Sequence, residues 1–323
     1  MRFATVEEPD GVVRCGVVVD GVLHRLPVGT TVLDLLREDR LFAAGRGALS
    51  ARDSVPLEEV RLLPPLEAPT VRDFVAFEEH VEGVRRGVEG RVGVVPEWYE
   101  APAFYFTNPH SLIGAHDEVA APPGCAVLDY ELEVAAVIGR VGSDLTPERA
   151  RSHIAGYTIF NDWSARDLQS REMRVGLGPA KGKDFAGTLG PVLVTADELE
   201  PHRDADGFLR LAMSVSVNGV ELGRDLLSNM GWTFEELVVH AARGSRVRPG
   251  DVLGSGTCGN GGCLAELWGR NGVQQPPPLR PGDVVEMTVE GIGGIANTVV
   301  GGPTEAEVAP VRPARPGQAA TVS

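Results

Sequence analysis

The sequence is poor in several features that define whole classes of protein. Its four cysteines are scattered over 323 residues, which excludes a disulfide-stabilised scaffold. No run of about 18 apolar residues occurs and no basic segment followed by an apolar one opens the chain, so we expect neither a membrane span nor a secretion signal. The net charge of −15 argues against a surface that binds nucleic acid. We therefore expect a cytoplasmic protein that acts away from membranes and nucleic acids.

The glycine-rich segment 254–263 lacks the patterns that bind nucleotides or zinc. It matches neither G-x-x-x-x-G-K-[ST] nor a G-x-G-x-x-G turn between a strand and a helix. Its two cysteines, Cys258 and Cys263, have no second Cys or His pair that would complete a zinc site. We expect them to be reduced thiols in a loop.

The chain divides into three parts by composition. Residues 1–66 contain the hairpin signal Asp20-Gly21 and end in the stiff connection Pro64-Pro65, and we expect them to form a small N-terminal domain. Residues 67–302 are long enough for a main domain with its own core. The tail 303–323 is rich in Pro, Ala and Gly, and we expect it to be disordered.

Strands dominate the pattern and do not alternate regularly with helices. We expect strands at 12–20, 22–26, 60–63, 129–139, 156–161 and 215–222, helices at 31–38, 73–86 and 227–243, a second hairpin turn at Asn218-Gly219, and turn-into-strand patterns at 249–253 and 281–289. The expected fold class is therefore α+β, with a mixed or antiparallel β core rather than a doubly wound sheet.

Three acidic residues at alternate positions, Asp129, Glu131 and Glu133, form the most informative local pattern. Alternate side chains of a strand share one face, so these carboxylates would lie side by side. Like charges on one face are unfavourable unless a cation neutralises them. A solvated edge strand is the alternative, but the run continues into the apolar residues 135–138, which indicates a buried strand. The pattern therefore predicts a site for a hard metal ion.

A second cluster begins at Asp162, which ends another strand predicted to be buried and is placed to join the same metal site. Arg166 and Gln169 follow on one face of a predicted helical turn and offer several hydrogen-bond donors to a negatively charged or carbonyl oxygen. A structural ion pair of Arg166 with Asp162 or Asp167 is the alternative. Lys183 lies in a predicted loop, where a lysine is usually exposed.

The irregular segment 87–109 carries many aromatic residues for a chain in which they make up only 6%. Tyr105 is one of them. Such a cluster fits a lid over a pocket and fits ordinary docking on the core equally well.

Four segments in register resemble the motifs of the fumarylacetoacetate hydrolase family. They are Leu-Asp-Tyr-Glu-Leu-Glu-Val at 128–134, Asn-Asp-Trp-Ser-Ala-Arg-Asp-Leu-Gln at 161–169, Gly-Lys-Asp-Phe at 182–185, and the Gly-Thr and Glu-Leu pairs within 256–267. The resemblance runs from about residue 70 to 300. It implies a β-rich main domain of mixed sandwich or roll type after a small α/β domain. It also implies an enzyme that acts, as a homodimer, on a small oxo-acid or diketone.

The resemblance assigns roles to particular residues. The metal, Mg²⁺ or Ca²⁺ with Mn²⁺ as a further option, would be held by Asp73, Glu131, Glu133 and Asp162. The catalytic residues would be His80, Glu266 and Lys183, and the substrate would be bound by Arg166, Gln169, Tyr105 and Thr257. Asp129 would have a supporting role at most.

The spacing of Asp73 and His80 favours the branch of the family that hydrolyses a carbon–carbon bond. In that branch a His follows the Asp ligand at this spacing and works with a Glu after the Gly-Thr loop, which is Glu266 here. The decarboxylases and acylpyruvate hydrolases of the family typically carry a Glu three residues after the His. This chain has Gly83 at that position.

Two positions depart from the pattern of that branch. Glu89 stands near the place of an Arg that binds the substrate carboxylate, and Met173 stands where the branch has a substrate-contacting Tyr. Both changes concern substrate recognition, so we expect hydrolysis of a carbon–carbon bond in a 1,3-diketone or acylpyruvate-type compound of another identity. A metal-dependent decarboxylase, hydratase or isomerase of a 2-oxo acid is the alternative, because stabilising an enolate serves all these reactions.

Overall fold

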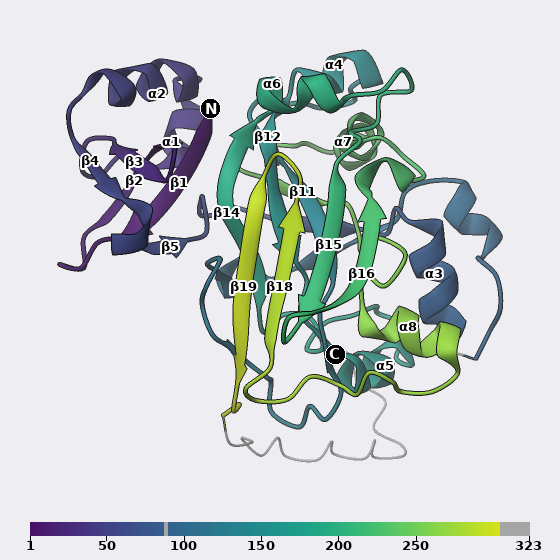
Figure 1. Ribbon diagram of the computed structural model, residues 1–323. Helices are drawn as coiled ribbons and strands as arrows, with labels where there is room; N and C mark the ends of the chain where they lie inside the picture. The colour runs from purple at the N-terminus through teal and green to yellow at the C-terminus, as the bar shows by residue number, and fades with distance from the viewer. Residues whose placement is uncertain (87–89, 304–323) are drawn as a thin grey trace, which may run out of the picture.

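Two packed β-sheets form the centre of the protein, which a computed structural model describes over residues 1–86 and 90–303 (Figure 1). The larger sheet contains β1 (Arg2–Glu7), β2 (Val13–Val19), β3 (Val22–Arg25), β4 (Ser54–Pro56), β5 (Arg61–Leu63), β6 (Val71–Phe74), β7 (Phe104–Thr107), β8 (Leu112–Ile113), β11 (Leu132–Ile138), β12 (Ile154–Asn161), β14 (Gly187–Thr195) and β17 (Val252–Gly254). Its main order is β4-β3-β2-β1-β14-β12-β11-β17-β6-β7, with β5 paired to β1 and β8 to β14.

The smaller sheet packs against one face of the larger sheet (Figure 1). It contains β9 (Val119–Ala120), β15 (Ala212–Val217), β16 (Val220–Leu226), β18 (Val284–Val289) and β19 (Gly293–Val300), in the order β16-β15-β18-β19-β9. Two further short strands, β10 (Leu128–Asp129) and β13 (Ser164–Ala165), pair with each other. Parallel and antiparallel pairs both occur, and the predicted α+β class with a mixed β core is confirmed.

The helices are short and lie around the sheets. They are α1 (Val32–Arg37), α2 (Leu41–Ser50), α3 (Glu78–Val84), α4 (Pro147–Arg151), α5 (Arg166–Met173), α6 (Ala196–Leu199), α7 (Phe234–Ala242) and α8 (Leu264–Asn271). Short 3₁₀ turns lie at Leu57–Glu59, Pro96–Tyr99, Pro109–Ser111, Glu200–His202 and Leu227–Asn229. Among the helices in the described residues, none has the length and apolar character that crossing a membrane requires.

Strand β11 is buried at every residue, as the sequence pattern predicted. Its side chains alternate between two hydrophobic cores. Val134 shares a core with Met287 of the smaller sheet, whereas Val137 shares a second core with Leu35 of α1. The strand therefore supplies a rigid, dry support for the acidic residues that precede and begin it.

Residues 1–66 join the main sheet through β1, which pairs antiparallel with β14 (Figure 1). Helices α1 and α2 contribute to the second core together with residues of β11, β12 and β14. The domain boundary at residue 66 stays a prediction. The predicted disordered tail lies outside the described residues, apart from its first residue.

Local turn and cap signals were reliable guides to the structure. Asp20 and Gly21, like Asn218 and Gly219, have positive φ angles and connect paired strands, as a two-residue hairpin turn requires. Thr31 accepts a hydrogen bond from the backbone N–H of Asp34, and the predicted helix follows it.

Three predicted boundaries were wrong. Instead of one helix over 73–86, the chain forms β6, which pairs with both β17 and β7, and α3 begins only at Glu78. The helix predicted from residue 227 begins at Phe234, because Thr233 and Glu236 form a capping box. The strand predicted over 129–139 is interrupted between β10 and β11.

Candidate active site

Four carboxylates converge at one end of neighbouring strands in the larger sheet. One ligand atom from each of Asp73, Glu131, Glu133 and Asp162 lies within 4.8 Å of all the others. Asp73 is on β6, Glu133 is on β11, and the other two lie directly before β11 and directly after β12. The strand order β12-β11-β17-β6 brings them together, although Asp73 is far from the other three in sequence.

Gly254 on β17 leaves the space that two of these carboxylates fill. A Cβ at this position would lie 2.4 Å from Asp73 Oδ1 and 2.9 Å from Glu133 Oε2. Either distance is too short for a real side chain, so a larger residue would displace the carboxylates. The sequence analysis missed this role, because nothing local distinguishes Gly254 from the other glycines of the loop.

The carboxylate cluster fits a divalent cation. Asp73 Oδ1 and Asp162 Oδ1 are buried, and neither has a hydrogen-bond partner in the described parts of the chain. Burial, reinforced by neighbouring carboxylates, raises the pKa of Asp73 and of Glu133 well above the usual values. A cation bound to these oxygens would compensate both the missing partners and the mutual repulsion. Hard oxygen ligands suit Mg²⁺, Ca²⁺ and Mn²⁺.

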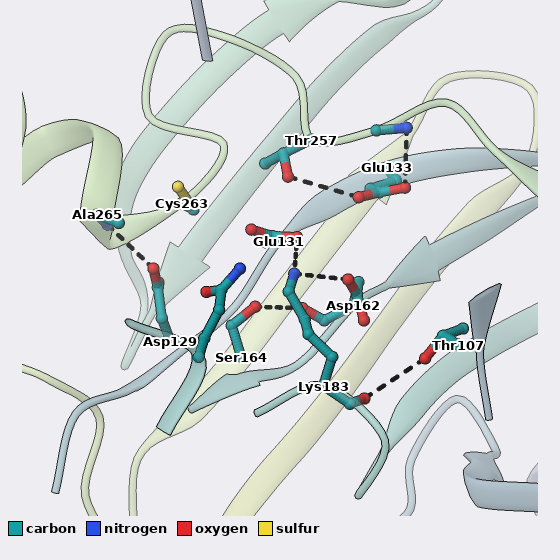
Figure 2. A network of polar contacts seen from close by, with 12 residues as sticks. Thr107, Asp129, Glu131, Glu133, Asp162, Ser164, Lys183, Thr257, Cys263 and Ala265 are labelled. Carbon is teal, nitrogen blue, oxygen red and sulfur yellow. Dashed lines mark hydrogen bonds and ion pairs between the residues drawn. The ribbon is translucent and has the colours of Figure 1, made fainter. Parts of the chain in front are cut away.

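Lys183 places a positive charge inside this cluster. Its Nζ lies 2.5 Å from Glu131 Oε2 and 2.6 Å from Asp162 Oδ2 (Figure 2). The side chain is only 4% exposed, unlike that of most loop lysines. Burial opposes its charge, but the two carboxylates raise its pKa above the ordinary value. The ammonium group is therefore fixed at the edge of the candidate cation site.

Arg166 supplies a second buried positive charge. Its Nη2 lies 2.7 Å from Glu131 Oε1 and 2.8 Å from Asp129 Oδ2, and its Nη1 donates to Gln169 Oε1. The alternative pairs with Asp162 or Asp167 are not formed. Burial alone would raise the pKa of Glu131, but Lys183 and Arg166 together hold it below the usual value. Because Gln169 accepts through Oε1, its amide N–H groups can donate to a substrate.

Asp129 connects Arg166 to helix α8. Oδ1 accepts a hydrogen bond from Leu264 N at 2.8 Å. Oδ2 accepts one from Ala265 N at 3.0 Å, the contact drawn in Figure 2. Oδ2 also accepts from Arg166 Nε at 2.8 Å. Asp129 therefore lies outside the four-carboxylate cluster and stabilises both an arginine and a helix N-terminus.

Thr257 belongs to the shell around the same cluster. Its Oγ1 donates to Glu133 Oε1 at 3.4 Å, while Gly256 N donates to Glu133 Oε2 at 3.1 Å. Tyr105 lies on β7, and its hydroxyl donates to Asp162 Oδ2. These contacts orient two of the candidate ligands.

A cavity of about 370 Å³ opens beside the cluster. Its lining includes Asp73, His80, Tyr105, Glu131, Glu133, Arg166, Gln169, Met173, Lys183 and Thr257. Met173 is 49% exposed, and Glu89 lies outside the described residues. Within the aromatic segment, Tyr105 lines the cavity, while Trp98 is buried and packs edge-on against Trp232.

A larger groove of about 690 Å³ lies beside α1 and α2, far along the sheet from the carboxylates. Its charged side chains pair with other protein groups: Arg25 with Asp53, and Arg40 with Glu38. We therefore place the candidate active site at the smaller cavity, where buried charges converge.

His80 lies on α3 and forms part of the cavity wall. Burial lowers its pKa to about 4, so the imidazole is neutral at physiological pH and can accept a proton. Its Nδ1 lies 3.7 Å from Cys263 Sγ. Within residues 1–86 and 90–303, no hydrogen bond joins His80 to Glu266.

Glu266 lies against α3 but does not line the cavity. A Cβ on Gly83 would lie 2.4 Å from Glu266 Cγ, so the two helices are in close contact there. The carboxylate pairs with Arg270 at 2.5 Å and accepts a hydrogen bond from Gly261 N at 3.2 Å. Burial raises its pKa to about 7. The structure thus places the expected pair His80 and Glu266 on adjacent, closely packed helices, with no hydrogen bond between these two described side chains.

The fold and this cavity define a class of protein, in which an α+β scaffold of two packed sheets surrounds a candidate site for a divalent cation. Residues 70–300 match the family model described as fumarylacetoacetate (FAA) hydrolase C-terminal. The chain belongs to the fumarylacetoacetate hydrolase family, as its four motifs predicted.

Named relatives within the family carry different activities. The chain is 32% identical over 259 residues to a fumarylacetoacetase of Arabidopsis thaliana, a match that covers 65% of this chain and 61% of that protein. It is 30% identical over 245 residues to the oxaloacetate tautomerase YisK of Bacillus subtilis, covering 75% of this chain and 74% of that protein. A solved fumarylacetoacetate hydrolase structure from Exiguobacterium antarcticum is 27% identical, with a TM-score of 0.73 over 93% of this chain and all of that chain.

Proposed function

We propose that this protein hydrolyses a carbon–carbon bond in a 1,3-diketone or acylpyruvate-type compound and that the reaction depends on a divalent cation. The observation that carries the proposal is a cavity lined both by His80, whose imidazole is neutral, and by three carboxylates of the buried cluster, Asp73, Glu131 and Glu133. The similarity to fumarylacetoacetases supports the same reaction class.

The residues fit a resident cation, which we propose to be Mg²⁺ or Ca²⁺, with Mn²⁺ as a third candidate. Asp73, Glu131, Glu133 and Asp162 would hold it. When bound, a divalent cation supplies Lewis-acid polarisation of the substrate's oxygens.

His80 would act as the general base. Its Nε2 accepts a proton from water, and the water oxygen forms a bond to a substrate carbonyl carbon. The electron pair of the C=O bond moves to the oxygen, and the negative charge there is stabilised by Lys183 and by the Gln169 amide, with Arg166 in support. The alkoxide pair then re-forms the C=O bond as the C–C bond breaks, the C–C electron pair leaves as an enolate, and the proton on His80 is transferred to that enolate.

Glu266 would assist through its charge. It lies in the helix packed against α3, and a carboxylate there stabilises the imidazolium that forms when His80 takes a proton. Tyr105 and Thr257 would orient the site, Tyr105 through Asp162 and Thr257 through Glu133. We propose a small-molecule substrate and a homodimeric assembly, as the family resemblance implies.

Two variants test the proposal. His80→Ala should abolish turnover and leave the affinity for Mg²⁺ unchanged in calorimetry; retained turnover would remove His80 from the mechanism. Glu131→Gln should weaken Mg²⁺ binding, while the exposed Glu82→Gln should not. Wild-type affinity in the Glu131 variant would show that the cation is held elsewhere.

A 2-oxo-acid tautomerase, isomerase, decarboxylase or hydratase is the second candidate. The match to the Bacillus subtilis tautomerase covers a larger share of both chains than the match to the Arabidopsis fumarylacetoacetase. Mass analysis of products separates the candidates. Hydrolysis gives two fragments with one added water, hydration gives one product with that water, decarboxylation releases CO₂, and tautomerisation leaves the mass unchanged.

A further inference from the structure

The hydrogen-bond partner of His80 decides which ring nitrogen is available as a base. A neutral imidazole carries one N–H and one lone pair, and its neighbours select between the two tautomers. In the structure, His80 Nδ1 lies 3.7 Å from Cys263 Sγ, and both side chains are buried. Sulfur accepts hydrogen bonds at longer distances than oxygen does, so this is a contact that can select a tautomer.

Glu266, the group expected beside His80, is engaged elsewhere. One carboxylate oxygen pairs with Arg270 at 2.5 Å and the other accepts from Gly261 N at 3.2 Å. The residue that touches the imidazole instead lies three positions earlier, at the cap of the same helix.

Cys263 is itself held in place from two directions. As the N-cap of α8, its sulfur accepts a hydrogen bond from Glu266 N at 3.4 Å. The next two backbone N–H groups donate to Asp129, which fixes the first turn of the helix. Burial raises the pKa of the Cys263 thiol well above its usual value, so the sulfur remains a neutral thiol.

We propose that Cys263 is a positioning residue for His80. Its Sγ accepts a hydrogen bond from Nδ1–H, which keeps the lone pair on Nε2, the nitrogen on the opposite side of the ring. The assignment rests on the proposed role of His80 as the base. It gives a function to a cysteine that the sequence motifs left without one.

The tautomer can be measured without any substrate. In the full-length protein with ¹⁵N-labelled histidine, seven residues give signals, and His80→Gln identifies those of His80. The wild type should show a protonated Nδ1 and an unprotonated Nε2. A protonated Nε2 in the wild type would overturn the proposal.

Three variants distinguish a positioning role of Cys263 from a general effect on the folding of the protein. Cys263→Ala should give His80 signals averaged between both tautomers and lower kcat on the order of threefold to tenfold, with KM nearly unchanged. Cys263→Ser keeps a hydroxyl acceptor and a good helix cap, and should restore the Nδ1–H tautomer and most of kcat. The matched control is Cys258→Ala, which removes another fully buried thiol of the same loop and should leave the tautomer unchanged.

An unchanged tautomer in Cys263→Ala would contradict the proposal, as would loss of the tautomer in Cys258→Ala. If Cys263→Ala does not fold, the wild-type and Cys263→Ser spectra still decide the question. The wild type could show the expected tautomer and yet turn over no diketone or acylpyruvate. That result would support the contact between Cys263 and His80 and would reject the hydrolase function.

Discussion

Lys183 supplies positive charge to the carboxylate cluster when no divalent cation is bound. Its ammonium group contacts Glu131 and Asp162, and all three side chains are buried. Removing one partner from a buried charge cluster leaves the other charges uncompensated.

Lys183→Met should therefore lower the free energy of unfolding in the presence of a chelator by about 3–5 kcal/mol. Added Mg²⁺ should raise the free energy of unfolding more in the variant than in the wild type, because in the variant it replaces a missing positive charge. Urea unfolding with and without Mg²⁺ measures both effects. Lys181→Met is the control, since Lys181 is exposed and its ion pair with Asp184 should contribute less than about 1 kcal/mol. Equal losses in the two variants would contradict the prediction.

Glu266 should make stability depend on pH in an unusual direction. Burial raises its pKa from the usual 4.5 to about 7, so the folded state holds a proton that the unfolded state releases at lower pH. Between pH 4.5 and 7 the folded state binds more protons, and its stability falls as the pH rises.

Glu266→Gln removes this titration. As the pH rises from 5 to 8, the free energy of unfolding of the variant minus that of the wild type should increase by on the order of 2 kcal/mol. Chemical denaturation at both pH values gives the difference, with the exposed Glu82→Gln as control. A constant difference between variant and wild type across this range would refute the assignment.

At the scale of elements, the contact between α3 and α8 depends on a glycine. A Cβ on Gly83 would lie 2.4 Å from Glu266 Cγ, well inside van der Waals contact. Gly83→Ala should lower the free energy of unfolding by about 1–3 kcal/mol, although alanine is the better helix former.

The matched control is Gly47→Ala in α2, where no atom outside the neighbouring residues and the backbone of the helix itself lies within 4 Å of the added methyl group. This variant should be stabilised by about 0.5–1 kcal/mol. Thermal or urea unfolding of both variants checks the pair. Equal effects of the two substitutions would show that Glu266 moves aside without cost.

Elements marked by local patterns could be predicted from the sequence, whereas β6, whose strand identity depends on distant partners, could not. The Asp20-Gly21 and Asn218-Gly219 turns require positive φ angles that few residues adopt, so a dipeptide is enough to predict them. Asp73 and Phe74, the end of β6, were assigned to a helix because the strands that pair with β6 include β17, which lies far away in sequence. Tertiary pairing overrode their local pattern.

The same distinction applies to the candidate site. Alternating acids indicated Glu131 and Glu133 directly, whereas Asp73 could be placed only through the family resemblance. Neither the burial of Lys183 nor the pairing of Arg166 with Asp129 follows from the local sequence, because both depend on which strands are neighbours.

At the scale of the whole molecule, residues 1–66 cover part of the main sheet. Strand β1 pairs with β14, and apolar residues of α1 share a core with β11. A chain of residues 67–302 would expose an unpaired strand edge and this apolar face.

The shortened chain should therefore have a Tm more than about 5 °C below that of the full chain and should bind a hydrophobic dye. Differential scanning fluorimetry and dye titration measure both properties. An unchanged Tm with no dye binding would show that residues 67–302 form a domain independent of the first 66.

Asp129 limits how the residues that line the cavity can be substituted, because it binds two parts of the site at once. The same carboxylate holds Arg166, which lines the candidate active-site cavity, and the backbone that begins α8, the helix preceded by Cys263. A substitution at Arg166 that suits a new substrate would leave Asp129 without its counter-charge, and the start of α8 would be disturbed with it. If Arg166 binds the substrate and His80 is the base, as proposed, substrate preference and the position of the base are not free to evolve separately.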